Sequence, residues 1–212
     1  MAINFKNLQQ INSQLRGIKD IEFLIVTKKR TIEDIKILIS LGHKCFGENR
    51  VQEAEKKFET RLIENNNLKL HLIGPLQTNK VNQALNLFHT IQSVDRPKLA
   101  ECISQQINKN KILKTKNFYI QVNIGKEEQK SGIDPSELKD FYQYCIELEL
   151  NIIGLMCIPP DVIDPSKYFL EMENLKKKIN VNLLLSMGMS NDYKIALKHN
   201  TNLIRIGSRI FV

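Results

Sequence analysis

The sequence predicts an α/β protein, a single (β/α)8 barrel of the TIM type with an extra N-terminal helix. Short apolar runs, often β-branched, alternate with longer amphipathic segments, a pattern typical of parallel strands joined by helical crossovers. Eight such runs can be counted. The 212 residues lie at the short end of the roughly 200 to 250 that such a barrel needs. We therefore expect residues 1–212 to form one domain.

The eight predicted strands are bounded by polar or glycine-containing turns. They are Phe23–Val26, Lys44–Phe46, Leu70–Ile73, Thr90–Val94, Phe118–Val122, Ile152–Met156, Leu183–Leu185 and Leu203–Ile206. Each segment between them exceeds the roughly one dozen residues that a parallel crossover requires. The spacing is therefore compatible with a parallel barrel throughout.

Residues typical of helix starts support the prediction that helices connect the strands. Thr31 precedes apolar residues at helical spacing and has Asp34 three residues later, which predicts a capped helix that Gly42 ends. Thr78 and Pro135 begin two further helices in a similar way.

An amphipathic segment from Phe5 to Ile18 predicts the extra helix before the first strand. Only six residues follow Ile206, too few for the helix that usually follows a last barrel strand. We expect the N-terminal helix to cover that gap.

Composition favours a globular cytoplasmic protein. Hydrophobic residues make up 42% and charged residues 25% of the chain, close to ordinary globular averages. No apolar run approaches the roughly 18 to 20 residues that cross a bilayer, and the N-terminus lacks the layout of a signal peptide. We expect no membrane contact.

Lys and Arg total 31 against 23 Asp and Glu, but no aromatic stacking platform accompanies them. We therefore expect solvated basic faces and no nucleic-acid partner.

The cysteines and histidines predict neither a disulfide framework nor a metal site. The four cysteines include no CxxC pair, and the four histidines lie far apart in the chain. We expect reduced, buried thiols. His71 opens the third predicted strand and is interpreted as a core or rim residue.

The turns after the last two predicted strands are the most informative part of the sequence. Barrels of this kind carry their chemistry at the strand ends, and these two loops commonly bind a phosphate through backbone N–H groups. The helix that follows Asn191 would add a favourable dipole. Glycine and serine also make ordinary tight turns, but here they occur at both expected positions. The residues that suit phosphate binding are Ser186, Gly188, Ser190, Gly207 and Ser208.

Two cationic residues are candidates for direct chemistry. Lys28 follows the first predicted strand and would point into a partly dry barrel mouth, which favours the neutral amine that forms a Schiff base. A solvated basic turn is the more common role of a Lys-Lys-Arg run, and spacing alone does not decide between the two. Arg205 lies inside the eighth strand and needs a partner or a ligand. A pyridine nitrogen and the carboxylate of Glu48 both suit it.

Taken in order, the motifs of the chain resemble the pyridoxal phosphate homeostasis proteins, which are similar to the barrel domain of alanine racemase standing alone. The resemblance covers essentially the whole chain. The segments that carry it are Val26–Lys28, Phe46–Glu53, His71–Lys80, Ile91–Asp95, Gln121–Ile124, Lys130–Ile133, Gly154–Met156, Leu185–Ser190 and Arg205–Gly207.

The resemblance implies a pyridoxal 5′-phosphate (PLP) site. Lys28 would form the internal aldimine and Arg205 would face the pyridine nitrogen, which weakens the electron sink that most PLP enzymes use. Asn49 would lie near the ring. The residues implied for the phosphate are Ser186, Gly207 and Ser208. The implied function is cofactor buffering and delivery to PLP-dependent apoenzymes, without catalytic residues and without an established reaction. We expect a monomer.

The sequence departs from the family pattern in two places. Arg30 and Thr31 stand where the family commonly has a second lysine and a proline, so a transfer role for that lysine does not carry over. The family continues with a glycine-rich tail where this sequence stops at Val212. Alternative functions are a PLP-dependent racemase-like enzyme, a Schiff-base or sugar-phosphate aldolase, and a basic nucleic-acid binder.

Overall fold

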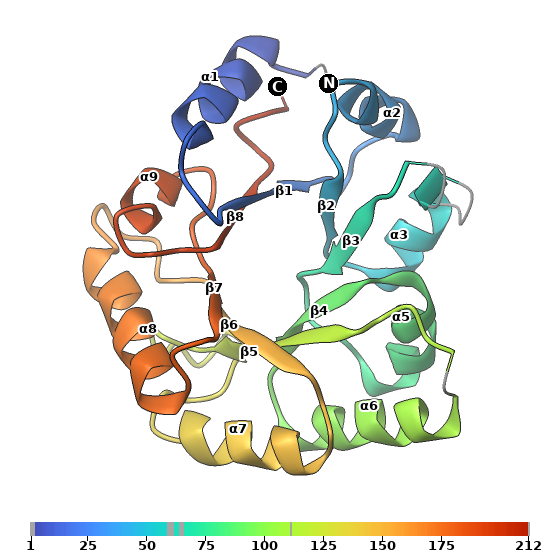
Figure 1. Cartoon of the computed structure of the whole chain (residues 1–212), viewed down its shortest axis with the longest axis vertical. Coiled ribbons are helices and arrows are strands. Elements are labelled where there is room, and N and C mark those ends of the chain that lie inside the picture. The colour runs from blue at the N-terminus through green and yellow to red at the C-terminus, as the bar shows by residue number, and fades with distance from the viewer. Residues whose placement is uncertain (1–2, 59–61, 64–65, 111, 212) are drawn as a thin grey trace.

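The computed structural model describes residues 3–58, 62–63, 66–110 and 112–211, and it contains a closed barrel of eight parallel strands (Figure 1). Leu24 on the first strand is in register with Arg205 on the last, which closes the barrel. All eight predicted strands are confirmed, with ends that differ from the prediction by at most two residues. The strands are β1 (Glu22–Val26), β2 (Cys45–Glu48), β3 (Lys69–Leu72), β4 (Thr90–Val94), β5 (Asn117–Val122), β6 (Ile152–Cys157), β7 (Leu184–Ser186) and β8 (Leu203–Ile206).

Helices surround the barrel on its outer face (Figure 1). They are α1 (Phe5–Leu15), α2 (Ile32–Ser40), α3 (Val51–Lys57), the 3₁₀ helix η1 (Thr78–Lys80), α5 (Val81–Leu87), α6 (Pro97–Lys109), α7 (Leu138–Glu147), α8 (Ser166–Ile179) and α9 (Tyr193–Ala196). In the described residues, none of these helices is both long and apolar enough to cross a membrane.

The predicted helix starts are confirmed. Thr31 and Asp34 form the reciprocal capping box at the start of α2, and Gly42 follows its end with φ +89°. Thr78 begins η1, which runs directly into α5, and α7 begins shortly after Pro135.

Helix α1 closes the ring between α9 and α2, as the sequence predicts (Figure 1). The Asn4 backbone N–H donates to the Ile210 carbonyl at 2.7 Å, and the Asn7 amide donates to the Arg209 carbonyl at 2.9 Å. Leu8 and Ile11 on its inner face are buried. The two ends of the described chain are therefore held side by side.

The main apolar core lies between the barrel and its helices, and a chain of polar side chains crosses the barrel interior. Ser186 on β7 donates to Gln92 on β4 at 2.6 Å, and Gln92 Nε2 lies 2.8 Å from His71 Nδ1 on β3. Because Gln92 presents its oxygen to Ser186, its amide nitrogen donates to His71, whose proton is then on Nε2. Burial lowers the pKa of His71 to about 4. The imidazole is therefore neutral near pH 7.

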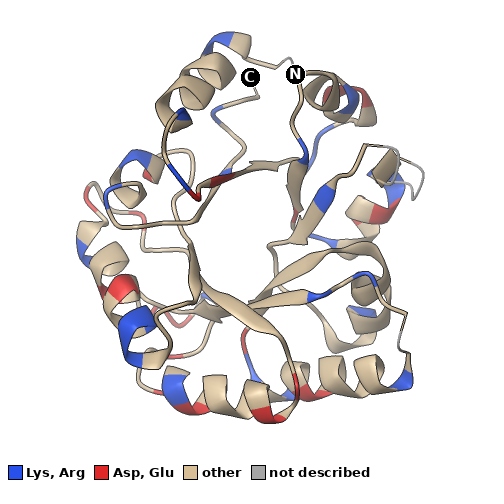
Figure 2. Ribbon diagram, in the orientation of Figure 1, with Lys and Arg blue, Asp and Glu red and all other residues tan. Residues whose placement is uncertain are grey.

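The charged residues lie mostly on the surrounding helices and loops, with Lys and Arg spread around the ring (Figure 2). They do not gather along one edge of the barrel in that view. This arrangement agrees with the solvated basic faces expected from the sequence.

Candidate functional site

A cavity of about 760 Å³ opens at the carboxyl ends of the strands. Several segments that lie far apart in the sequence form its wall. The lining residues are Val26, Lys28, Asn49, Ile73, Lys130, Ile158–Ile163, Met189–Asp192, Arg205, Gly207 and Ser208. Five of the six residues predicted to bind the cofactor, all except Ser186, are in this set. This is the end of the barrel where (β/α)8 proteins carry their active sites.

Lys28 lies in a tight turn directly after β1. The Arg30 backbone N–H donates to the Thr27 carbonyl at 3.0 Å, and Lys29 has φ +59°. Lys29 is outside the cavity lining, and its backbone N–H donates to the Glu53 carboxylate. The turn therefore presents one of its two lysines to the cavity, as strand alternation predicts.

A buried ion cluster behind this turn was missed by the sequence analysis. Lys57 Nζ donates to the Thr27 carbonyl at 2.7 Å, to Glu48 Oε1 at 3.0 Å and to Glu53 Oε1 at 2.6 Å. Burial raises the pKa of Glu48, while hydrogen bonds from Thr27 and Lys57 oppose that rise. Although burial also acts on Glu53, hydrogen bonds from Lys57 and Lys29 lower its pKa overall. The cluster ties the Lys28 turn to α3, and the four-residue spacing of Glu53 and Lys57 was its only signal in the sequence.

Arg205 is buried in the wall of the cavity. Its guanidinium donates to the Ser186 carbonyl at 2.6 Å, to Ser186 Oγ at 2.7 Å and to the Cys157 carbonyl at 2.6 Å. Burial lowers the pKa of Arg205 from its ordinary value. The alternative ion pair with Glu48 does not form, because Glu48 is bound to Thr27 and Lys57. In the described part of the chain, Arg205 has no carboxylate within salt-bridge distance.

The structure does not bring Ser186 to the cavity. Its hydroxyl is fully buried, donates to Gln92 and accepts from Arg205, so it cannot also turn to a ligand at the cavity surface. Ser190, four residues later, lines the cavity instead, together with Gly207 and Ser208. Met189 also lines the cavity, whereas Met187 lies in the core.

The helix expected to help bind an anion is a single turn. Helix α9 has four residues, and the Asp192 carboxylate before it accepts the Met189 backbone N–H at 2.5 Å. The expectation of a helix dipole at the site was therefore wrong, because one turn with an acidic residue at its start contributes little positive potential. Gly188 in the preceding turn has φ +96°, and a Cβ there would lie 2.6 Å from Ala196 Cβ. The turn requires glycine at that position.

The loops after β5 and β6 supply the outer wall of the cavity. Lys130 donates to the Pro159 carbonyl at 3.0 Å and pairs with Glu127 at 2.5 Å. Asn49, after β2, lies at the inner edge, where Gly74 allows close packing: a Cβ at Gly74 would meet the Asn49 carbonyl oxygen at 2.3 Å. Lys130 lies in one of the segments that carry the family resemblance, Lys130–Ile133, but its position in the cavity wall was not predicted.

Comparisons with known proteins place the chain in a family. The family model for the alanine racemase N-terminal domain matches residues 5–212. A pyridoxal phosphate homeostasis protein of Aquifex aeolicus is 38% identical over 205 residues, which cover 92% of this chain and 88% of the relative. The chain belongs to the pyridoxal phosphate homeostasis protein family. A second family member, from Pasteurella multocida, is 35% identical over 217 residues, which cover 97% of this chain and 92% of the relative.

Solved structures agree with this assignment. PipY of Synechococcus elongatus, in a structure with PLP bound, is 30% identical with a TM-score of 0.83, over 98% of this chain and 99% of PipY. Its structure without PLP has a TM-score of 0.86 at 29% identity, with the same coverage. An alanine racemase of Clostridium difficile, at 16% identity and a TM-score of 0.74, shares the fold over 96% of this chain and 57% of the racemase. The resemblance stated from the sequence is thus confirmed.

Proposed function

We propose that this chain binds PLP and takes part in PLP homeostasis, with Lys28 as the covalent attachment point. The observation that carries the proposal is that Lys28, in the turn after β1, and Arg205, on the neighbouring strand β8, line the same cavity. A lysine amine is the group that bonds to the PLP aldehyde. The PLP bound to PipY, a relative of this chain, supports the choice of cofactor.

The side chains of the cavity fit the three parts of PLP. The Lys28 amine suits the aldehyde, and the buried Arg205 guanidinium suits the pyridine nitrogen as a fixed hydrogen-bond donor. Ser190 and Ser208 offer hydroxyls to a phosphate, and Gly207 allows close approach of its backbone. We therefore propose these three residues for the phosphate and assign Ser186 to holding Arg205. The apolar side chains of Val26, Ile73, Ile158 and Met189 suit the faces of the ring, with Asn49 near its edge.

We propose that the bound cofactor is stored and passed on, without catalysis by this chain. PLP supplies an electron sink when its ring nitrogen is protonated, and an arginine at that nitrogen opposes protonation. Arg205 is held in place by three hydrogen bonds and cannot easily turn away. The described lining residues include no histidine or tyrosine, and Lys130, which could otherwise act as a base, pairs with Glu127. We further propose that the chain acts as a monomer and delivers PLP to apoenzymes.

The attachment point is tested by absorbance and mass spectrometry. We expect the protein to give a yellow species with PLP that borohydride fixes as an adduct on the peptide containing Lys28. Lys28→Ala should lose both the colour and the adduct. Lys29→Ala is the matched control, since Lys29 lies in the same turn but outside the cavity lining, and it should retain both. A colourless wild-type protein, or an adduct on another lysine, would overturn the proposal.

A measurement of turnover distinguishes storage of PLP from catalysis with PLP. A racemase-like enzyme would exchange the α-hydrogen of alanine with deuterated solvent at the rates of ordinary PLP enzymes. We expect exchange far below such rates, together with transfer of PLP to an added apoenzyme. Rapid exchange that is lost in Lys28→Ala would favour the racemase-like alternative and leave PLP binding intact.

A further inference from the structure

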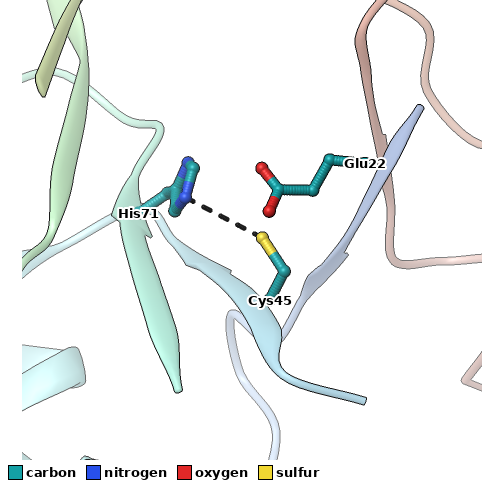
Figure 3. Close-up of side chains that lie close together, drawn as sticks. All are labelled: Glu22, Cys45 and His71. Atoms are coloured by element: carbon teal, nitrogen blue, oxygen red, sulfur yellow. Dashed lines mark hydrogen bonds between the residues drawn. The ribbon is translucent and has the colours of Figure 1, made fainter. Parts of the chain in front are cut away.

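A second cluster of reactive side chains lies at the opposite end of the barrel from the cavity. Glu22 and Cys45 are the first residues of β1 and β2, and His71 is the third residue of β3. Figure 3 shows the three side chains pointing toward one another from these neighbouring strands. None of the three lines the cavity at the other end. Their positions are 23 and 26 residues apart in sequence, which explains why spacing alone did not reveal them.

The distances within the cluster suit one metal ion. Cys45 Sγ and His71 Nε2 are 3.8 Å apart, and one potential ligand atom from each residue lies within 4.8 Å of the others. Zinc binds sulfur at about 2.3 Å and nitrogen at about 2.0–2.1 Å, so two such ligands on a tetrahedral ion lie roughly 3.5 Å apart. Small side-chain adjustments would therefore bring all three ligands onto an ion.

The ligand types in the cluster also indicate which class of metal ion would bind. A thiolate, an imidazole and a carboxylate together match zinc and similar borderline-soft divalent ions, and they do not match calcium or magnesium, which prefer oxygen ligands. Cys45 and His71 are 7% and 3% exposed, so they would be fixed by packing. Gln92 lies beside His71 Nδ1, and once its amide turned, its oxygen could accept the N–H that metal-binding histidines usually donate.

We propose that Glu22, Cys45 and His71 bind a zinc-class divalent ion, with water as its fourth ligand. The Glu22 side chain is 32% exposed, so this end of the cluster is open to solvent. In the structure Lys69 Nζ pairs with Glu22 at 2.9 Å and occupies this side. The ion would take over the Glu22 carboxylate and release Lys69 to solvent, where 64% of its side chain is already exposed.

Binding requires a defined movement of protons. The Cys45 thiol gives its proton to solvent as the sulfur–metal bond forms. His71 moves its proton from Nε2 to Nδ1, which requires the Gln92 amide to turn and present its oxygen. The carboxylate already lacks a proton, so one proton is released for each ion bound.

Cobalt(II) is the probe, because a cobalt–thiolate bond gives a charge-transfer absorption that imidazole and carboxylate ligands alone do not. The full chain, freed of metal with a chelator, is titrated with cobalt(II) and then with zinc. We expect a 1:1 charge-transfer signal that zinc displaces, and a rise in Tm with zinc. Absence of the signal would show that the cluster is an ordinary buried polar network with a Glu22–Lys69 ion pair, and would overturn the proposal.

Matched variants locate the signal. Cys45→Ser should abolish the charge-transfer band, whereas Cys145→Ser, at a buried thiol on α7 outside the cluster, should keep it. His71→Gln should weaken cobalt binding at least about tenfold. Circular dichroism shows whether each variant is folded, and in folded variants the zinc-induced rise in Tm should shrink in parallel. A band that survives in Cys45→Ser, or one lost in Cys145→Ser, would contradict the assignment.

Discussion

Ser186 and Ser190 lie four residues apart near the end of β7, and the structure separates their roles. Ser190 lines the cavity, whereas Ser186 bonds to Gln92 and Arg205 inside the barrel. We expect Ser190→Ala to weaken PLP affinity about tenfold or more, since a hydrogen bond to a charged group contributes about 1.5–3 kcal/mol, with little effect on Tm.

Ser186→Ala should instead lower the free energy of unfolding by about 1–3 kcal/mol, because Gln92 and Arg205 would each lose a buried partner. Urea unfolding and PLP titration of both variants check this pair of predictions. If Ser186→Ala weakened PLP binding with unchanged stability, the phosphate role first predicted for Ser186 would be restored.

His89 links the pH dependence of stability to one backbone hydrogen bond. The Leu70 N–H donates to His89 Nδ1 at 3.1 Å, which requires a neutral ring. Burial, and then the charges of Lys114 and Lys69, lower the pKa of His89 from its ordinary 6.5. The stabilisation by this hydrogen bond is therefore complete above pH 6.5. It is lost as the pH falls through the lowered pKa of His89 in the folded state.

His89→Asn keeps an acceptor atom near Nδ1 but does not titrate. We expect its free energy of unfolding to fall less steeply than that of the wild type as the pH is lowered from about 7 to about 5. Urea unfolding across that range is the measurement. Parallel curves for the two proteins would show that His89 does not contribute.

The turn that carries Lys28 depends on α3 through Lys57. Replacing Lys57 with Met leaves the buried Glu48 and the Glu53 carboxylate without their cation, and removing one partner from a buried ion pair costs about 3–5 kcal/mol. We expect Lys57→Met to be destabilised by that amount in urea unfolding. Lys56→Met, on the exposed side of the same helix, should change stability by about 0.5 kcal/mol or less. Equal stability of the two variants would contradict a structural role for the cluster.

Elements were predicted best where local chemistry alone determines them. The cap of α2 was read correctly because Thr31 and Asp34 act within one turn. Strand β2 was predicted to end at Phe46 but extends to Glu48. The buried Glu48 carboxylate is paired there with Lys57 of α3. A sequence pattern treats Glu48 as a turn residue, since its partner lies nine positions away and its burial depends on tertiary structure.

Closure of the barrel depends on α1 as well as on strand pairing. Ile11 on its inner face is fully buried, so Ile11→Ala should cost about 2–5 kcal/mol through lost packing and the cavity left behind. Phe5, on the same helix, is 51% exposed, and Phe5→Ala should cost far less. Thermal unfolding of both variants is the check. A similar, small cost for both would show that α1 contributes little to the packed structure.

The arrangement of the site was predictable because a parallel barrel brings all strand ends together. This rule predicted that Lys28, Arg205 and Gly207 lie near one another, and the family resemblance added Asn49. It could not assign Ser186, because contacts across the barrel depend on which side chains fill the interior. Cys45 and His71 were read as isolated residues for the same reason.

The interior hydrogen bonds share one direction. Arg205 donates to Ser186, Ser186 to Gln92, Gln92 to His71, and the His71 Nε2 proton faces Cys45. Hydrogen bonds in such a series strengthen one another. If Ser186 or Gln92 alone reversed its direction, two donors or two acceptors would face each other. If the His71 proton moved from Nε2 to Nδ1, Gln92 would have to turn, and the Ser186 hydroxyl, which accepts from the Arg205 guanidinium, would have to reorient. The direction of these bonds therefore links Cys45, at one end of the barrel, to Arg205, in the wall of the cavity at the other.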